Sequence, residues 1–330
     1  MRSGARRLRP MGVADILDET VELYKSSFIL LVGIAAVMYV PYSVFTQYAA
    51  TRLISIASLP NRAPGPEIYS SLAITAISYL YLFITAPLVT GALTYAISEV
   101  YLGHKPTILD SFRRVFSFSI FGQLLAAIGL KVIVFIIPLM FAVSVVFLSV
   151  MSFVTLQSSW PVILGLVLIP LFSVALSIFL LLRLALIEPA IIVETSGVGH
   201  AISRSWKLMS GNLGKCLGLY FITLIVVSFV SYFATIPTQS AVAGAIIKGV
   251  APSGVFIALH TIISALVGAA LAPVTSIVII LLYYDIRIRK EGFDLELLAD
   301  EMSSTRDSYW MKPELPQEQP PISDPPGTDQ

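Results

Sequence analysis

Long stretches without a charged residue dominate the pattern of hydrophobic and polar positions along this chain of 330 residues. A helix needs about 20 apolar residues to cross a hydrocarbon core roughly 30 Å thick. Five uncharged stretches are long enough for one crossing, and the longest, between Lys131 and Arg183, is long enough for two. The pattern therefore predicts an all-α integral membrane protein with six transmembrane helices, near 27–49, 71–101, 121–149, 161–187, 215–239 and 255–284.

The composition points to the same class of protein. Hydrophobic residues make up 56% of the chain and charged residues 12%, whereas a soluble domain carries about 25% charged residues. This balance excludes an ordinary soluble enzyme, and the single cysteine, Cys216, excludes a disulfide scaffold. The formal net charge of +1 gives no reason to expect a nucleic-acid partner. Membrane lipids are the partners that such a composition predicts.

The distribution of lysine and arginine predicts the orientation. Seventeen of the 21 lysines and arginines fall in segments that share one side of a six-span topology, whereas Arg52, Arg62 and Lys248 fall on the other side. Cytoplasmic loops carry the excess of positive charge in membrane proteins. We therefore expect a multi-pass protein of the cell (cytoplasmic) membrane with both termini in the cytoplasm.

Three polar segments have the periodicity of short amphipathic helices, and each leads into an odd-numbered span. Their apolar stripes are Val13, Ile16, Leu17, Val21 and Tyr24 in the first, Ile108, Leu109, Phe112, Val115 and Phe116 in the second, and Ile202, Trp206, Met209 and Leu213 in the third. Helices of this length are too short to span and suit the headgroup boundary. We expect these elbow helices to contact the membrane surface through Arg113, Arg114, Arg204, Trp206 and Lys207.

The same segments suggest an internal repeat. Ile16-Leu17-Asp18 recurs 92 residues later as Ile108-Leu109-Asp110, and Ala201-Ile202-Ser203 follows at a similar interval. Three copies of an elbow helix and a transmembrane hairpin would explain this spacing. The alternative is that similar membrane constraints produced similar strings.

Small residues recur at every fourth position of two spans. The sixth span has Ser264, Gly268, Ala272 and Ser276, and the second has Ala86, Thr90, Thr94 and Ser98. Small residues let helices approach closely in lipid. The rows predict close packing, within one chain or between copies in a homo-oligomer, and a substrate groove is the alternative.

No catalytic or metal-binding motif accompanies the apolar spans. The sequence lacks a His-Glu-x-x-His zinc motif, a phosphate-binding glycine loop and a Gly-x-Ser-x-Gly nucleophile elbow. His104, His200 and His260 lie far apart, and one cysteine does not make a metal site. We therefore expect no enzymatic activity, no metal and no cofactor.

Ionisable residues at membrane depth are the candidates that remain. Lys131 interrupts the apolar run of the third span, where a lysine costs roughly 2.5–3.5 kcal/mol to insert. Its amine either reaches the headgroups or pairs with an inward-facing carboxylate, Glu99 or Asp285, at a site for an anion or lipid headgroup. A second group of ionisable residues lies at the cytoplasmic ends of the even-numbered spans, where such residues also serve to anchor a helix end. The candidate ligand or ion site is Lys131, Glu99, Arg183, Glu188 and Asp285.

The two ends of the chain differ from the spans. Residues 1–10 form a basic cytoplasmic arm, and 11–300 form the membrane domain. Apolar content collapses in 301–330, where six prolines occur, so we expect a disordered cytoplasmic tail.

The chain also resembles a known bacterial family. The strings Tyr283–Glu296 and Ala201–Leu208, together with Arg9-Pro10 and Ile16-Leu17-Asp18, look like the glycerophosphoryl diester phosphodiesterase membrane domain. The resemblance covers roughly 9–300 and implies a protein of the bacterial inner membrane. Only the membrane part is matched, and the phosphodiesterase barrel fused to it in some relatives is not expected here. No catalytic residue is therefore carried over.

These observations favour a non-enzymatic membrane protein that binds or helps to transport an amphiphilic or anionic small molecule. The main alternative is a membrane scaffold that recruits cytoplasmic partners through its elbow helices and tail. A lipid-modifying enzyme is the third alternative, and it lacks a recognisable nucleophile or base.

Overall fold

The computed structural model describes residues 10–57, 66–156, 160–195, 197–248, 250 and 252–292. Residues 1–9 of the basic arm and the whole tail 301–330 lie outside the described residues. Six long helices dominate the described part: α2 (Phe28–Ala57), α3 (Pro66–Tyr101), α5 (Phe118–Leu156), α6 (Trp160–Arg183), α9 (Leu213–Ile247) and α10 (Gly254–Glu291). Each belongs to a segment long and apolar enough to cross a membrane. The prediction of an all-α membrane protein with six spanning helices is confirmed.

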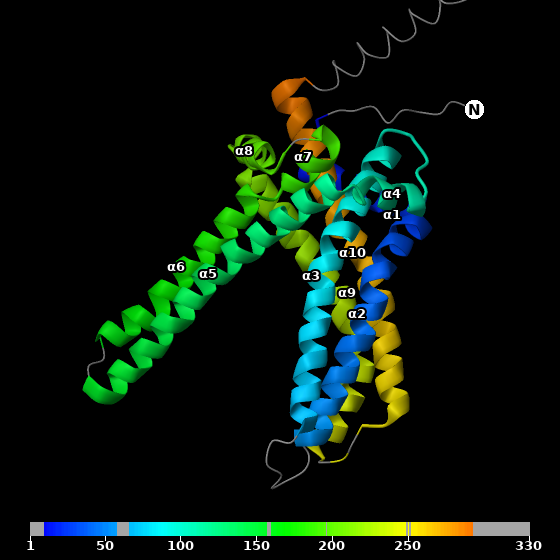
Figure 1. Cartoon of the computed structure of the whole chain (residues 1–330). Helices are drawn as coiled ribbons and strands as arrows, with labels where there is room; N and C mark the ends of the chain where they lie inside the picture. The colour runs from blue at the N-terminus through cyan, green and yellow to red at the C-terminus, as the bar shows by residue number, and fades with distance from the viewer. Residues whose placement is uncertain are drawn as a thin grey trace, which may run out of the picture.

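Four short helices lie together at one end of the bundle (Figure 1). They are α1 (Val13–Ser26), α4 (Ile108–Val115), α7 (Ile187–Glu194) and α8 (Val198–Met209), and we call this end the short-helix end. Helices α1, α4 and α8 occur where amphipathic segments are expected, whereas α7 is an element that the hydrophobic pattern does not predict. The three-unit repeat stays a prediction.

The fourth span is shorter than expected because the chain breaks before α7. Helix α6 ends at Arg183 rather than near 187, and α7 begins at Ile187. Pro189 lacks the N–H that an uninterrupted helix would need there, but it is tolerated in the first turn of a new helix. The hydroxyl of Ser205 in α8 provides a partner for backbone groups on both sides of the break. It donates to the Arg183 carbonyl at 2.7 Å and accepts from the Leu186 N–H at 3.2 Å.

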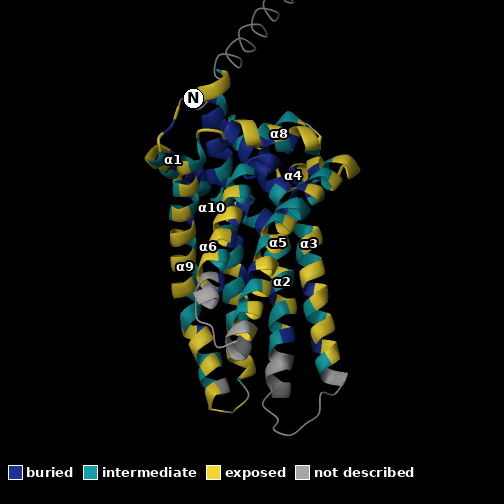
Figure 2. Cartoon of the chain, turned by 90° about the vertical axis from the view of Figure 1, so that its left-hand side faces the viewer, coloured by how far each residue is buried: buried dark blue, intermediate teal, exposed yellow. Residues whose placement is uncertain are grey.

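Buried residues gather at the short-helix end (Figure 2). The largest fully buried side chains include Tyr283 and Tyr284 of α10, and Ile16 and Leu23 of α1. The apolar stripe of α1 therefore packs largely inside the protein, and only Val21 of that stripe is exposed. Lipid already solvates apolar side chains along the spans, so burial between elements is concentrated where the helices leave the hydrocarbon.

The long helices form two groups. Helices α2, α3, α9 and α10 run together, whereas α5 and α6 pack on each other as a hairpin that leans away from them (Figure 1). The hairpin meets the rest of the molecule near the short-helix end, through α3, α4, α7, α8 and α9. Along the middle of α5 most side chains are exposed, from Ile133 to Phe147. In a bilayer, lipid or another apolar molecule must cover these surfaces.

Each long helix contains one internal proline: Pro41, Pro87, Pro138, Pro170, Pro237 and Pro273. A proline removes the N–H that would bond to the carbonyl four residues earlier. For Pro41 that carbonyl belongs to Val37, and the hydroxyl of Tyr81 in α3 donates to it at 2.7 Å. The proline in α2 therefore creates a hydrogen bond between two helices, and this bond satisfies a carbonyl that lipid cannot.

Candidate functional site

Lys131 of α5 forms an ion pair with Glu188 of α7. Its Nζ lies 2.6 Å from both carboxylate oxygens, and the side chains of Lys131 and Glu188 are 21% and 8% exposed. Of the two alternatives for Lys131, the structure shows pairing with a carboxylate, but the partner is Glu188 and not Glu99 or Asp285. The sequence pattern places Glu188 at the end of a continuous fourth span, whereas the break before α7 carries it across to α5.

The pair lies at the level of the short helix α7 rather than at the middle of α5. Helix α5 begins at Phe118, so Lys131 stands about 20 Å along it at 1.5 Å per residue. The residues from Lys131 to Leu156 span roughly 37 Å, which is enough for a tilted crossing. Pairing with α7 therefore places Lys131 at the level of the short helices, where its charge costs less than at the centre.

Helices α7 and α9 complete the surroundings of this pair. Glu188 lies in the first turn of α7, where the helix dipole favours a carboxylate. The pair lies close enough to α9 for its charges to reach Cys216 and, one turn further, Tyr220. The pair thus lies where the α5–α6 hairpin joins the other helices.

Asp285 organises a second polar cluster. Its carboxylate is fully buried and lies 2.5 Å from Lys215 Nζ and 3.0 Å from Arg289 Nε. It also accepts the Met11 N–H at 2.6 Å, while Lys215 and Arg289 both donate to the Met11 carbonyl. The sequence identifies Asp285 but misses Lys215 and the Met11 backbone, because they come from segments 70 and 274 residues away.

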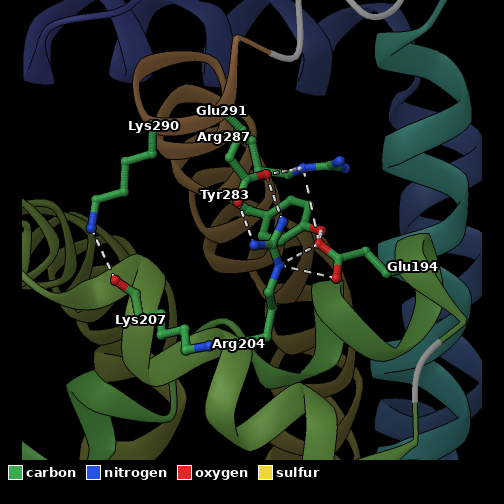
Figure 3. Close-up of polar contacts among 7 residues, drawn as sticks. All are labelled: Glu194, Arg204, Lys207, Tyr283, Arg287, Lys290 and Glu291. Carbon is green, nitrogen blue, oxygen red and sulfur yellow. Dashed lines mark hydrogen bonds and ion pairs between the residues drawn. The ribbon is translucent and has the colours of Figure 1, made fainter.

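A third cluster joins α7, α8 and α10 (Figure 3). Arg204 binds Glu194 at 2.9 Å and also pairs with Glu291. Glu194 accepts the Tyr283 hydroxyl at 2.6 Å, and Arg287 lies 3.2 Å from Glu291. The hydrogen bond to Glu291 and the pairing with Glu194 raise the pKa of Arg204 above its ordinary value. The structure thus places Arg204 in contacts within the protein, and the sequence misses Glu194.

The other predicted residues occupy separate positions. Arg183 lies over the rings of Phe179 and Trp206, with its guanidinium carbon 5.3 Å and 4.9 Å from their centroids, and donates to the Trp206 carbonyl at 3.2 Å. Glu99 pairs with His104 at 2.7 Å. The remaining three, Arg113, Arg114 and Lys207, are exposed.

The residues of the expected site are therefore not brought together as one site. Lys131 and Glu188 form one pair, and Asp285, Glu99 and Arg183 each have different partners. In the described part of the chain there is no group of three or more His, Cys, Asp or Glu that could hold a metal ion.

Part of each row of small residues lines a cavity of about 350 Å³ between α2, α3, α9 and α10. Thr90, Gly268, Ala272 and Ser276 contribute to its wall. The ring of Tyr39 in α2 packs on Gly268, where an added Cβ would lie 2.5 Å from Tyr39 Cδ1. The row in α10 therefore permits one close contact at Gly268, with Tyr39 of α2, and it also leaves space between the helices.

The fold and these clusters define the chain as a multi-pass α-helical membrane protein. Residues 11–286 match the family described as Domain of unknown function (DUF7847), and the chain belongs to this family. No curated protein and no solved structure matches the chain. The family description assigns no activity, so the proposal below depends on the contacts within the molecule.

Proposed function

We propose that this protein is a non-enzymatic membrane protein that binds, and helps to transport, an amphiphilic or anionic small molecule. The observation that carries the proposal is the Lys131–Glu188 pair at the junction between the hairpin and the other helices. Ionisable residues within membrane segments are costly and are functional hypotheses by default. Lys131 has the larger exposed fraction of the two side chains, so we place the contact with the ligand on its side of the pair.

The arrangement suggests how such a molecule binds. An anionic group that reaches Lys131 shares or replaces Glu188 as its partner, so the charge of the amine stays compensated throughout. The apolar part of the molecule lies along the exposed side chains of α5, such as Ile136 and Met140. A ligand bound in this way holds the hairpin relative to α7 and α9.

Orientation and location are part of the same proposal. The excess of lysine and arginine supports a short-helix end that faces the cytoplasm of a bacterial inner membrane, with both termini on that side. Reporter fusions at Ser158 and at the carboxyl terminus test this topology. An external carboxyl terminus contradicts it. The kinship with the glycerophosphoryl diester phosphodiesterase membrane domain stays a prediction from the strings that carry the resemblance.

Native mass spectrometry of the protein extracted in mild detergent tests the binding role. We expect co-purified anionic amphiphile on the wild type and one bound copy fewer on Lys131→Leu/Glu188→Leu, in which neither charge is left unpaired. Lys248→Leu removes an exposed lysine beyond the other end of α9 and is the matched control. Equal retention by the wild type and the double variant removes Lys131 from the site.

A scaffold role is the second candidate, and one observation favours it. Leu109 in α4 and Phe116 just after it are 75% and 68% exposed, beside the exposed Arg113 and Arg114. This surface fits either the headgroup boundary or a cytoplasmic partner. If the protein is a scaffold, Leu109→Ser/Phe116→Ser impairs its cellular role, whereas Lys131→Leu/Glu188→Leu does not.

A further inference from the structure

A second cavity, of about 640 Å³, lies between the start of α2 and the end of α3 at the short-helix end. Its wall includes Lys25 from the last turn of α1, the first turn of α2, and His104 and Lys105 after α3. This volume falls within the range of 300–1,000 Å³ that is common for small-molecule sites. The cavity is separate from the Lys131–Glu188 pair, with which it shares no lining residue.

The cavity wall is positively charged. Lys25 and Lys105 are exposed, and the amine of neither forms an ion pair or a hydrogen bond with any residue that the structure describes. No acidic residue contributes to the wall, and the nearby Glu99 is held by His104 at 2.7 Å. The first N–H groups of α2 add to this charge, because a helix start carries unsatisfied donors and a partial positive charge. An anion is the ligand that these groups recognise.

The rim of the same cavity is apolar. Phe28 and Ile29 belong to the wall and are 45% and 83% exposed. Both open a spanning helix, so they stand where the hydrocarbon begins. A ligand that satisfies both parts of the cavity has an anionic group beside the lysines and an apolar chain beside Ile29.

We propose that this cavity binds the phosphate group of an anionic membrane phospholipid. The phosphate lies between Lys25 and Lys105, and the acyl chains follow Phe28 and Ile29 into the bilayer. The site is independent of the function proposed above, because it uses different residues on different helices. Phosphate-bearing soluble compounds share the anionic chemistry but would leave the apolar rim uncovered.

Titration of the detergent-purified, delipidated full chain followed by native mass spectrometry tests this site. The probes are phosphatidylglycerol, phosphatidylcholine and glycerol 3-phosphate. We expect phosphatidylglycerol to bind at least about tenfold more tightly than phosphatidylcholine. Lys25→Gln and Lys105→Gln should each weaken it about fivefold, and the double variant about 25-fold, because a lysine near an anionic lipid contributes an attraction of that size.

Two controls keep the result specific. Lys248→Gln removes one exposed charge outside the cavity and should bind phosphatidylglycerol as the wild type does. Lys131→Leu/Glu188→Leu should also leave this site unchanged, so failure of one proposal is distinguishable from failure of the other. Unchanged phosphatidylglycerol affinity in Lys25→Gln/Lys105→Gln overturns the proposal. Equal affinity for phosphatidylcholine, or for glycerol 3-phosphate, overturns its assignment to an anionic lipid.

Discussion

Lys131 and Glu188 lie in contact, with little exposure to solvent, where α5 meets the short helix α7. Removing two charges from water is costly, and their mutual attraction repays that cost only when both partners are present. The two 2.6 Å contacts give the amine a short bond to each carboxylate oxygen. The pair therefore behaves as a unit, and its two members should not be tested only one at a time.

Single substitutions in this pair should destabilise the protein more than the double substitution. Lys131→Leu leaves the Glu188 carboxylate buried without its cation and should cost about 3 kcal/mol of unfolding free energy. Lys131→Leu/Glu188→Leu removes both charges and should recover most of that loss. Thermal unfolding in detergent measures Lys131→Leu, Glu188→Leu and the double variant. Additive losses in the double variant contradict a coupled pair.

Gly268 lies where the small-residue row of α10 touches the Tyr39 ring. An added methyl group would lie 2.5 Å from Tyr39 Cδ1 and force the ring to move. Gly268→Ala should therefore destabilise the protein by about 1–3 kcal/mol, the usual cost of overpacking. Gly218→Ala in α9 is the control, because nothing lies within 4 Å of its added Cβ. Equal thermal stability of the two variants contradicts the close contact between α2 and α10.

At the scale of elements, the internal proline of α2 leads to a hydrogen bond between two helices. Pro41 frees the Val37 carbonyl, and Tyr81 of α3 supplies the missing donor. The contact joins two neighbouring spans at a position that a bilayer would shield from water. The need for such a bond follows from the proline alone, because backbone groups in lipid must have hydrogen-bond partners within the protein.

A double-mutant cycle tests this exchange. Tyr81→Phe removes only the hydroxyl and should cost about 1 kcal/mol in the wild-type chain. In the Pro41→Ala background residue 41 gains an N–H for the Val37 carbonyl, so the same substitution should cost much less. Unfolding free energies of the four proteins give the coupling. A cost of Tyr81→Phe that is equal in both backgrounds contradicts the role of the proline.

The elements differ in how far the sequence predicts them. The six spans follow from uncharged length alone, since the cost of charge in lipid excludes alternatives. Helix α7 is not predicted, because residues 187–192 are buried on all sides and continue the apolar run of α6 without a periodic polar face. The break depends on Ser205, which comes from the following helix.

The candidate sites were less predictable than the spans for a related reason. Residue type identified Lys131, Glu188 and Asp285 as groups that need partners. Which partner each finds depends on contacts between helices that hydrophobic periodicity does not encode. Lys215 is an example, because its sequence position suggests only a helix start, whereas the fold brings it to Asp285, 70 residues away.

For the whole molecule, the last turns of α10 hold several elements of the short-helix end together. Asp285 binds α9 and the Met11 backbone, and Glu291 binds α8. The Lys290 amine donates to the carbonyls of Lys207 and Ser210 at the end of α8. One helix end thus fixes the positions of the amino-terminal segment and of two other helices. The spans themselves have less buried surface with which to set their arrangement.

Substitutions around Asp285 should have graded effects on this connection. Asp285→Asn leaves Lys215 without its buried counter-charge and should cost about 3 kcal/mol or more. Arg289→Gln should cost less than about 1 kcal/mol, because the Arg289 side chain is 46% exposed and Lys215 still compensates the carboxylate. Thermal unfolding in detergent measures both.

Hydrogen exchange then separates a local effect from a general loss of stability. If Asp285 holds the amino-terminal segment through Met11, exchange in α1 should accelerate strongly in Asp285→Asn, while the membrane-embedded part of α3 stays protected. Helix α1 should respond first, because it has few contacts with elements other than α10. The hydrogen bond between Met11 and Asp285 lies just before its buried stripe around Ile16 and Leu23, and this bond is lost. Equal acceleration along α1 and α3 would instead mean that Asp285 stabilises the bundle as a whole, and an unchanged α1 would mean that packing alone holds this segment.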